Sequence, residues 1–131
     1  MSLYDDRPWL ALYDEGVPAD LEAPFPDCVS MFDAAVRAHP DKPLVHYFGT
    51  TLTVADVDRQ SAALAVAMAE QFGLRRGDRV VVQLQNVPTF LIAMLAIWRL
   101  GAIVVPVNPM YKQRELAGLL TDSGARLLIE E

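Results

Sequence analysis

The chain has 131 residues, of which 53% are hydrophobic and 21% are charged, a composition typical of a folded domain and not of a disordered segment. Its net charge is −6, from 11 Lys and Arg against 17 Asp and Glu, and no basic stripe is present, so nucleic-acid binding is not expected. The single cysteine, Cys28, excludes an internal disulfide and favours a reducing compartment, from which we expect a cytoplasmic location.

The sequence shows no sign of export or of a membrane span. Acidic residues occupy the N-terminus, where a signal peptide needs basic ones. The longest apolar run, 90–107, approaches the length of a bilayer span, but Arg99, Gly101 and Pro106 interrupt it and divide it into a helix and a strand. No transmembrane segment is therefore expected, and a peripheral contact with a membrane surface stays open.

Residues 1–27 are expected to form an extended arm that precedes an α/β unit over residues 28–131. Four prolines in the arm forbid a long helix: Pro8, Pro18, Pro24 and Pro26. Four apolar residues stand among the acidic residues of the arm and could anchor it: Trp9, Leu10, Leu12 and Tyr13. A free tail would be poorer in aromatic side chains. We expect such an arm to lie across its own domain or across a partner.

The next segments predict a helix and a hairpin. Ser30 can cap a helix whose first turn holds Asp33, and Pro40 ends that helix directly after His39. The stretch "LVHYFGTTLTV", residues 44–54, has the β propensity and the central glycine of a short hairpin.

A longer helix follows the hairpin. Thr53, with Asp56 three residues later, is favourable at a helix N-terminus, and Gly73 ends the helix. Apolar and small residues recur at helical spacing on one face, which is expected to pack inward: Val57, Ser61, Leu64, Ala65, Met68 and Phe72.

The rest of the chain alternates strands and helices. Residues 80–84, "VVVQL", are apolar and β-branched on both faces, as in a central parallel strand. Asn86 can cap the next helix, Pro88 fits its first turn, and the helix stops at Gly101 before a second strand, 103–107.

The pattern then repeats with a helix over about 111–122, ended by Gly124, and a third strand in "ARLLIE". Strand, helix and strand in this order predict right-handed βαβ crossovers. We therefore expect an α/β fold of three layers, an open and mainly parallel sheet with flanking helices on both faces.

No familiar phosphate or metal motif is found in the chain. The seven glycines form neither G-x-G-x-x-G nor G-x-x-x-x-G-K-[ST]. Cys28, His39 and His46 match no zinc spacing, and Cys28 has no neighbouring cation that would activate its thiol. Three pairs of adjacent carboxylates are interpreted as solvated charge: Asp5–Asp6, Asp14–Glu15 and Glu130–Glu131. No residue is therefore assigned a catalytic, cofactor-binding or metal-binding role.

Two stretches leave a functional and a structural interpretation open. "GDRV" is more simply a turn that starts a strand, with Asp78 bonded to its own loop. "PVNPMY" lies at the carboxyl end of a parallel strand, where open α/β folds bind ligands, so Asn108 could donate to a ligand and Tyr111 could wall a pocket. In the structural interpretation, which we favour, Asn108 fits a turn, Pro109 starts the next helix and Tyr111 packs against the arm.

Three longer stretches carry a resemblance to a known family. They are "TTLTVADVDRQSAALAVAMAEQFGLRRGDRVVVQLQNVPTFLIAMLAIWRLGAIVVPVNPMYKQREL", "LLTDSGARLLIEE" and the earlier "RPWLALYDEGVPADL". Together they resemble the amino-terminal part of the AMP-forming acyl-CoA synthetases of the adenylate-forming superfamily, and within it the long-chain fatty-acid–CoA ligases. The order and spacing of "GDRV", "QNVP", "RLGAIVVPVNPMY" and "REL…DSGA" carry this resemblance.

The resemblance implies an enzyme that activates a fatty acid with Mg²⁺-ATP, forms an acyl-adenylate and passes the acyl group to coenzyme A. In that family a Ser/Thr/Gly-rich loop ending in Pro-Lys-Gly handles the triphosphate, and a lysine of a mobile C-terminal domain stabilises the developing charge. This chain contains neither, and it lacks the aromatic-Gly-x-Thr-Glu motif and the hinge residue. We therefore interpret it as an N-terminal fragment whose catalytic residues lie beyond Glu131, inactive alone and with no cofactor bound.

Two other functions stay open. One is a different carboxylate-activating enzyme of the superfamily, such as an aryl-CoA ligase or a peptide-synthetase adenylation domain. The other is a non-catalytic flavodoxin-like binding module, which the strand ends "QLQN" and "VNP" disfavour because they carry no carboxylate. A subdomain cut from a larger sheet is also expected to expose an apolar edge or face, and hence to self-associate.

Overall fold

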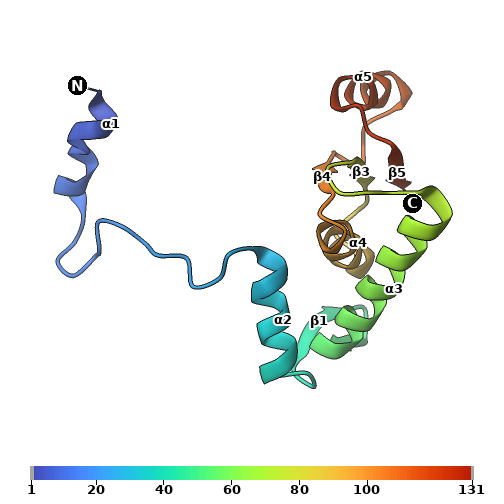
Figure 1. Ribbon diagram of the computed structural model, residues 1–131, viewed down its shortest axis with the longest axis horizontal. Helices are drawn as coiled ribbons and strands as arrows, with labels where there is room; N and C mark the ends of the chain where they lie inside the picture. Colours follow the sequence, from blue (N-terminus) through green and yellow to red (C-terminus); the bar gives the residue numbers. More distant parts are fainter. Residues whose placement is uncertain (1, 131) are drawn as a thin grey trace.

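The chain forms two sheets joined by helices in the computed structural model, which describes residues 2–130 (Figure 1). Expectations that involve Met1 or Glu131, such as the carboxylate pair Glu130–Glu131, fall outside the described residues. The larger sheet is parallel, in the order β4-β3-β5, and consists of β3 (Arg79–Gln83), β4 (Ile103–Pro106) and β5 (Leu127–Glu130). The smaller is the antiparallel hairpin of β1 (Pro43–Tyr47) and β2 (Thr50–Thr53). The predicted α/β fold class is thus confirmed.

Strand β3 occupies the centre of the parallel sheet because its side chains are apolar on both faces. Val80, Val81 and Val82 are each 0% exposed, and β3 forms parallel ladders with both β4 and β5. A strand covered on both faces reads as a continuous β-branched run, which is the pattern that the sequence shows.

Helices cover both faces of this sheet. Helix α4 (Pro88–Arg99) connects β3 to β4, and α5 (Gln113–Ser123) connects β4 to β5. Because β4 and β5 lie on opposite sides of β3, right-handed crossovers place these two helices on opposite faces. Figure 1 shows this arrangement, with α4 on one side of the sheet, α5 on the other and α3 (Val54–Phe72) packed beside α4. The three predicted layers are present.

The hydrophobic core lies between β3, α4 and α3. Ala93, Ala96 and Ile97 on α4 are 0% exposed, and Met68 on α3 is 2% exposed. A second cluster forms around Val57 of α3, toward the hairpin. Helix α5, by contrast, contributes no buried side chain among its described residues, so the face of the sheet that it covers is the less sealed one.

Helix α3 has the two ends that the sequence predicts. The Thr53 Oγ1 atom accepts a hydrogen bond from the Asp56 N–H at 3.1 Å, and the Asp56 carboxylate accepts one from the Thr53 N–H at 3.0 Å. Bonds from Thr53, and then from Arg59, lower the pKa of the Asp56 carboxyl to about 2. Gly73 ends the helix in the left-handed region, at φ 64°.

Two predicted helix caps are wrong, and a third helix start was predicted approximately. Helix α2 (Cys28–Ala38) is capped by Asp27, whose carboxylate accepts from the Ser30 N–H at 2.7 Å; aspartate caps as well as serine, and it lies three residues earlier. Helix α4 has Val87 at its cap position, with Pro88 in its first turn as predicted, so Asn86 is not a cap. Helix α5 begins at Gln113, two residues after the approximate start that the sequence predicted.

Residues 2–27 form an arm that projects away from the rest of the chain (Figure 1). It contains the short helix α1 (Leu3–Asp6) and the 3₁₀ helix η1 (Pro8–Leu12), followed by extended chain. The Arg7 guanidinium pairs with the Asp20 carboxylate at 2.8 Å. The arm therefore closes on itself. It does not lie across residues 28–130, so the expectation that it packs on its own domain is wrong.

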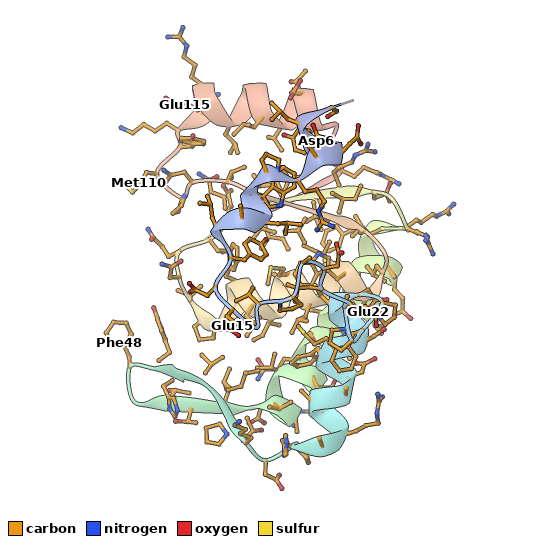
Figure 2. All side chains as sticks on the ribbon, turned by 90° about the vertical axis from the view of Figure 1, so that its left-hand side faces the viewer. Asp6, Glu15, Glu22, Phe48, Met110 and Glu115 are labelled. Atoms are coloured by element: carbon orange, nitrogen blue, oxygen red, sulfur yellow. The ribbon has the colours of Figure 1, made fainter. Side chains whose placement is uncertain are left out.

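The hairpin turn and α5 place side chains at the periphery. Phe48 at the hairpin turn is 92% exposed, and Met110 stands just before α5 (Figure 2). Phe48 and Gly49 both have positive φ, 40° and 81°, as a two-residue hairpin turn requires.

Within residues 2–130 no helix combines the length and apolar character needed to cross a membrane.

Arg99, in the last turn of α4, connects three helices. Its guanidinium donates to the Asp58 carboxylate and, at 3.2 Å, to Ser61 Oγ on α3. It also lies 3.7 Å from the Asp33 carboxylate on α2, and 5.9 Å from the centre of the Phe32 ring. The Arg99 side chain is only 19% exposed, so this cluster is better shielded from water than an ordinary surface ion pair.

The cap of α3 predicts the effect of Thr53→Ala. This change removes the hydroxyl that accepts from the Asp56 N–H, so we expect the free energy of unfolding in urea to fall by about 1 kcal/mol. Thr121→Ala is the control, because the Thr121 hydroxyl bonds only the Ala117 carbonyl of its own exposed helix. Equal losses in the two variants would contradict a capping role for Thr53.

The Arg99 cluster predicts a larger loss for Arg99→Met. Methionine keeps much of the apolar stem but leaves the Asp58 carboxylate without its cation. We therefore expect the free energy of unfolding to fall by roughly 1–3 kcal/mol. Arg59→Met is the matched control, because the Arg59 side chain is 70% exposed and pairs within its own helix. Urea titrations that give the same midpoint for both variants would show that the cluster contributes no stability.

Candidate functional site at the carboxyl edge of the sheet

The three parallel strands end at one edge of the sheet. Gln83 of β3 is in register with Glu130 of β5, and Val82 is in register with Pro106 of β4. A cavity of about 500 Å³ opens at this edge, where open α/β sheets bind their ligands. It is lined by side chains from the strand ends, the loop after β4 and the start of α5: Gln83, Gln85, Pro109, Tyr111, Gln113, Leu116, Leu128 and Glu130.

Gln83 is the buried polar residue of this edge. Its side chain is 8% exposed, and its Nε2 atom donates to the Tyr111 carbonyl at 2.8 Å. The carbonyl oxygens of Pro109 and Asn108 lie farther from the same nitrogen, at 3.4 and 3.5 Å. The side chain thus joins the end of β3 to the backbone of the loop that follows β4.

The loop after β4 gives a mixed outcome for the sequence interpretation. Asn108 forms the expected turn, with its Oδ1 accepting from the Met110 N–H at 2.9 Å and its carbonyl accepting from the Tyr111 N–H at 3.0 Å. Pro109 does not start a helix, because α5 begins four residues later. Tyr111 lines the cavity and is 42% exposed, and the arm on which it was expected to pack projects elsewhere.

The "GDRV" stretch lies at the opposite, amino edge of the sheet. The Asp78 carboxylate accepts from the Arg75 N–H at 2.8 Å and pairs with Arg126 at 3.2 Å, so Asp78 closes its own turn as the structural interpretation expected. A larger cavity, of about 750 Å³, opens near this edge between the first turn of α2 and the last turn of α4. Its size does not make it the better site, because ligands of parallel sheets bind at the carboxyl edge.

The three potential soft metal ligands do not come together. Cys28 is the exposed first residue of α2, and His39 follows the last turn of the same 11-residue helix, so about 16 Å of helix separates them. His46 lies on β1, with Nδ1 3.0 Å from Thr51 Oγ1. In the described part of the chain no three His, Cys, Asp or Glu side chains are arranged to hold a metal ion.

The chemistry of the cavity is mostly neutral. Its lining combines three carboxamides, a phenol and two leucines with a single carboxylate, Glu130, and includes no Lys or Arg among the described residues. Such a surface can donate and accept hydrogen bonds, but it offers no positive charge to a triphosphate. The described lining residues therefore do not by themselves fit Mg²⁺-ATP.

Gln83 is the site residue that sequence reasoning misses, because it stands inside the apolar strand "VVVQL". The available signal is that an amide inside a run that is buried on both faces must find a partner. That signal predicts a hydrogen bond but not its partner, because Tyr111 is 28 residues away in the sequence.

Comparisons with known proteins give consistent matches. A family model described as "AMP-binding enzyme" matches residues 32–131. A long-chain-fatty-acid–CoA ligase of Haemophilus influenzae is 38% identical over 125 residues, which are 95% of this chain and 22% of the relative. A plipastatin synthase of Bacillus subtilis is 34% identical over 103 residues, which are 79% of this chain and 4% of the relative.

A solved structure agrees with these matches. The N-terminal subdomain of Klebsiella oxytoca NpsA, in complex with 3-hydroxyanthranilyl-AMSN, superposes with a TM-score of 0.74 at 30% sequence identity. The superposition covers 79% of this chain and 26% of that one. The chain spans about a fifth of the length of the curated ligase that it matches, 22%.

Proposed function

The chain belongs to the AMP-binding enzyme family, and from this premise we propose that it supplies the N-terminal part of a long-chain fatty-acid–CoA ligase. Such a ligase makes acyl-CoA from a fatty acid, ATP and coenzyme A through an acyl-adenylate, with Mg²⁺ accompanying the ATP. The observation that carries the proposal is the extent of the match with the Haemophilus influenzae ligase. It covers 95% of this chain, and so includes most of the arm that precedes the family match at residue 32.

In this proposal the described residues act as scaffold. The parallel sheet holds the loop after β4 and the start of α5 at the carboxyl edge, and the neutral lining there forms part of a wall around the substrates. The groups that bind the triphosphate and stabilise the charge of the transition state are proposed to lie beyond Glu131. We further propose that the protein acts in the cytoplasm.

A peptide-synthetase adenylation domain is the second candidate. The match with plipastatin synthase covers 79% of this chain, and a fused form of NpsA is described as an adenylation–PCP di-domain NRPS; both observations support this candidate. The match with plipastatin synthase leaves about a fifth of the chain uncovered, whereas the match with the Haemophilus influenzae ligase leaves 5%. This difference favours the ligase. A flavodoxin-like binding module has no comparable support, because the family match runs through all the elements from α2 onward.

The proposal predicts where activity resides. A protein in which this chain continues into the rest of a ligase should release pyrophosphate when given ATP, Mg²⁺ and a long-chain fatty acid, and should then form acyl-CoA. The 131-residue chain alone should release none, because the cavity at the carboxyl edge of its sheet has no cationic group for the triphosphate among its described lining residues. A coupled pyrophosphate assay checks both preparations.

Two results of that assay would contradict the proposal. Pyrophosphate release by the 131-residue chain alone would show that the chain carries the catalytic groups. Release by the longer protein with amino acids and not with fatty acids would favour the peptide-synthetase candidate. Acids of increasing chain length, from acetate to palmitate, serve as the substrate series.

We also propose that the 131-residue chain self-associates. The parallel sheet has two edges, β4 and β5, that pair with no further strand among the described residues, and large apolar side chains are exposed beside them: Ile103 at 45% and Met110 at 73%. Open edges and exposed apolar surface favour contact between copies. Sedimentation equilibrium from 5 to 500 µM (chosen as roughly the range of weak association) should show a mass that rises with concentration, and a constant monomer mass would contradict this.

A further inference from the structure

Gln83 makes a buried side-chain hydrogen bond, to the Tyr111 carbonyl, that no role described so far explains. It is one of two buried polar side chains among the described residues, and the other, Ser61, donates to the Asp58 carbonyl of its own helix. A buried polar group without a partner destabilises the fold, so the environment of Gln83 must satisfy it. An amide nitrogen has two hydrogens. The bond to the Tyr111 carbonyl, at 2.8 Å, is the shortest contact of this nitrogen, and the contacts to the Pro109 and Asn108 carbonyls are longer, at 3.4 and 3.5 Å.

The loop that receives these bonds has few other attachments to the sheet. Its internal bonds are local, with the Met110 and Tyr111 N–H groups bonded to Asn108 and the Lys112 N–H bonded to the Glu115 carboxylate. At its start the Val107 N–H bonds the Val82 carbonyl at 3.0 Å. Over the described residues, Gln83 is the one sheet residue whose side chain hydrogen-bonds to this loop.

We propose that Gln83 is a positioning residue, which holds the loop 107–112 against the end of β3 and thereby fixes Tyr111 and the start of α5 at the carboxyl edge. This inference rests on the proposed function, in which that edge forms part of the substrate wall. The contact spans 28 residues of sequence and bypasses both α4 and β4, so it sets the position of the loop relative to the central strand directly.

The role depends on hydrogen-bond donation and not on size. A carboxylate at position 83 would face the carbonyl oxygens of the loop with no hydrogen to give them, whereas a protonated carboxyl group has one O–H donor. A side chain of similar length without polar atoms would fill the space but donate nothing. These two replacements separate the positioning role from simple packing.

The test uses Gln83→Met and Gln83→Glu in the 131-residue chain, with Gln71→Met as the matched control on the exposed part of α3. Hydrogen exchange of the amides of residues 110–112 is measured against that of the core amides 80–82 between about pH 4.5 and 8, corrected for intrinsic rates. Gln83→Met should speed the loop amides about tenfold at every pH, which is the exchange equivalent of losing one hydrogen bond. The core amides and the control should stay at wild-type rates.

Gln83→Glu tests donation separately from packing, because a purely packing role of residue 83 would not make the exchange of the loop amides depend on pH in this way. Carbonyl oxygens around a buried carboxyl group disfavour its ionised form, so the pKa of the new carboxyl should be raised above its usual value of about 4.3. The loop amides should therefore exchange fast at high pH and slow again as the pH falls and the carboxyl regains its proton. Gln83→Met should show no such recovery.

Three results would overturn the inference: loop exchange in Gln83→Met within twofold of wild type, no recovery of Gln83→Glu at low pH, or equal acceleration of the core amides 80–82. None of these measurements uses catalysis, so their failure would leave the ligase proposal standing. In the complete ligase, Gln83→Met should also lower kcat/KM for the fatty acid about tenfold, the kinetic equivalent of about 1.4 kcal/mol. An unchanged kcat/KM would overturn the positioning role in the reaction. A wild-type ligase that activates no fatty acid would refute the proposed function and not the loop contact.

Discussion

The burial of β3 on both faces is the constraint on which the rest of the structure depends. Val80, Val81 and Val82 are fully buried, and burying each valine side chain contributes roughly 1.5–3 kcal/mol. A strand covered in this way needs a ladder partner on each side and a helix on each face. The chain meets both needs with two right-handed crossovers that leave β3 in opposite directions, which is why α4 and α5 lie on opposite faces.

The same constraint creates the candidate site. A central strand that is buried from Val80 onward carries its last residue, Gln83, into a partly enclosed edge, where the carboxamide has to find partners. In the loop after β4 the Tyr111 carbonyl accepts the hydrogen bond of the Gln83 amide at 2.8 Å. This hydrogen bond satisfies both the buried amide and the loop carbonyl, and it holds the loop at the edge of the sheet. The cavity is thus a consequence of how the central strand ends.

Elements with local signals could be predicted from the sequence, and those set by distant contacts could not. Thr53 and Gly73 mark the ends of α3 because capping needs only residues within one turn. Asp27 and Ser30 are both good caps three residues apart, so propensity alone could not choose between them. The hydrogen-bond partners of Arg99 on α3 are about 40 residues away, and the sequence shows Arg99 only as an interruption of an apolar run. The partner of Gln83 is also distant in the sequence, 28 residues away. The sequence therefore predicts a ligand edge at the carboxyl ends of the strands but not that Gln83 holds its loop.

The net charge of the chain lies in the arm and not in the α/β unit. Residues 2–27 hold seven of the 17 acidic residues and one of the 11 basic ones, which leaves ten of each sign for residues 28–131. The arm therefore carries the entire net charge of −6, and the α/β unit has none. A unit without net charge does not repel its own copies, and its open strand edges face no electrostatic barrier to pairing. The arm, which folds back on itself through Arg7 and Asp20 and stands clear of the sheet, is then the part of the chain whose like charge opposes close approach of a second copy.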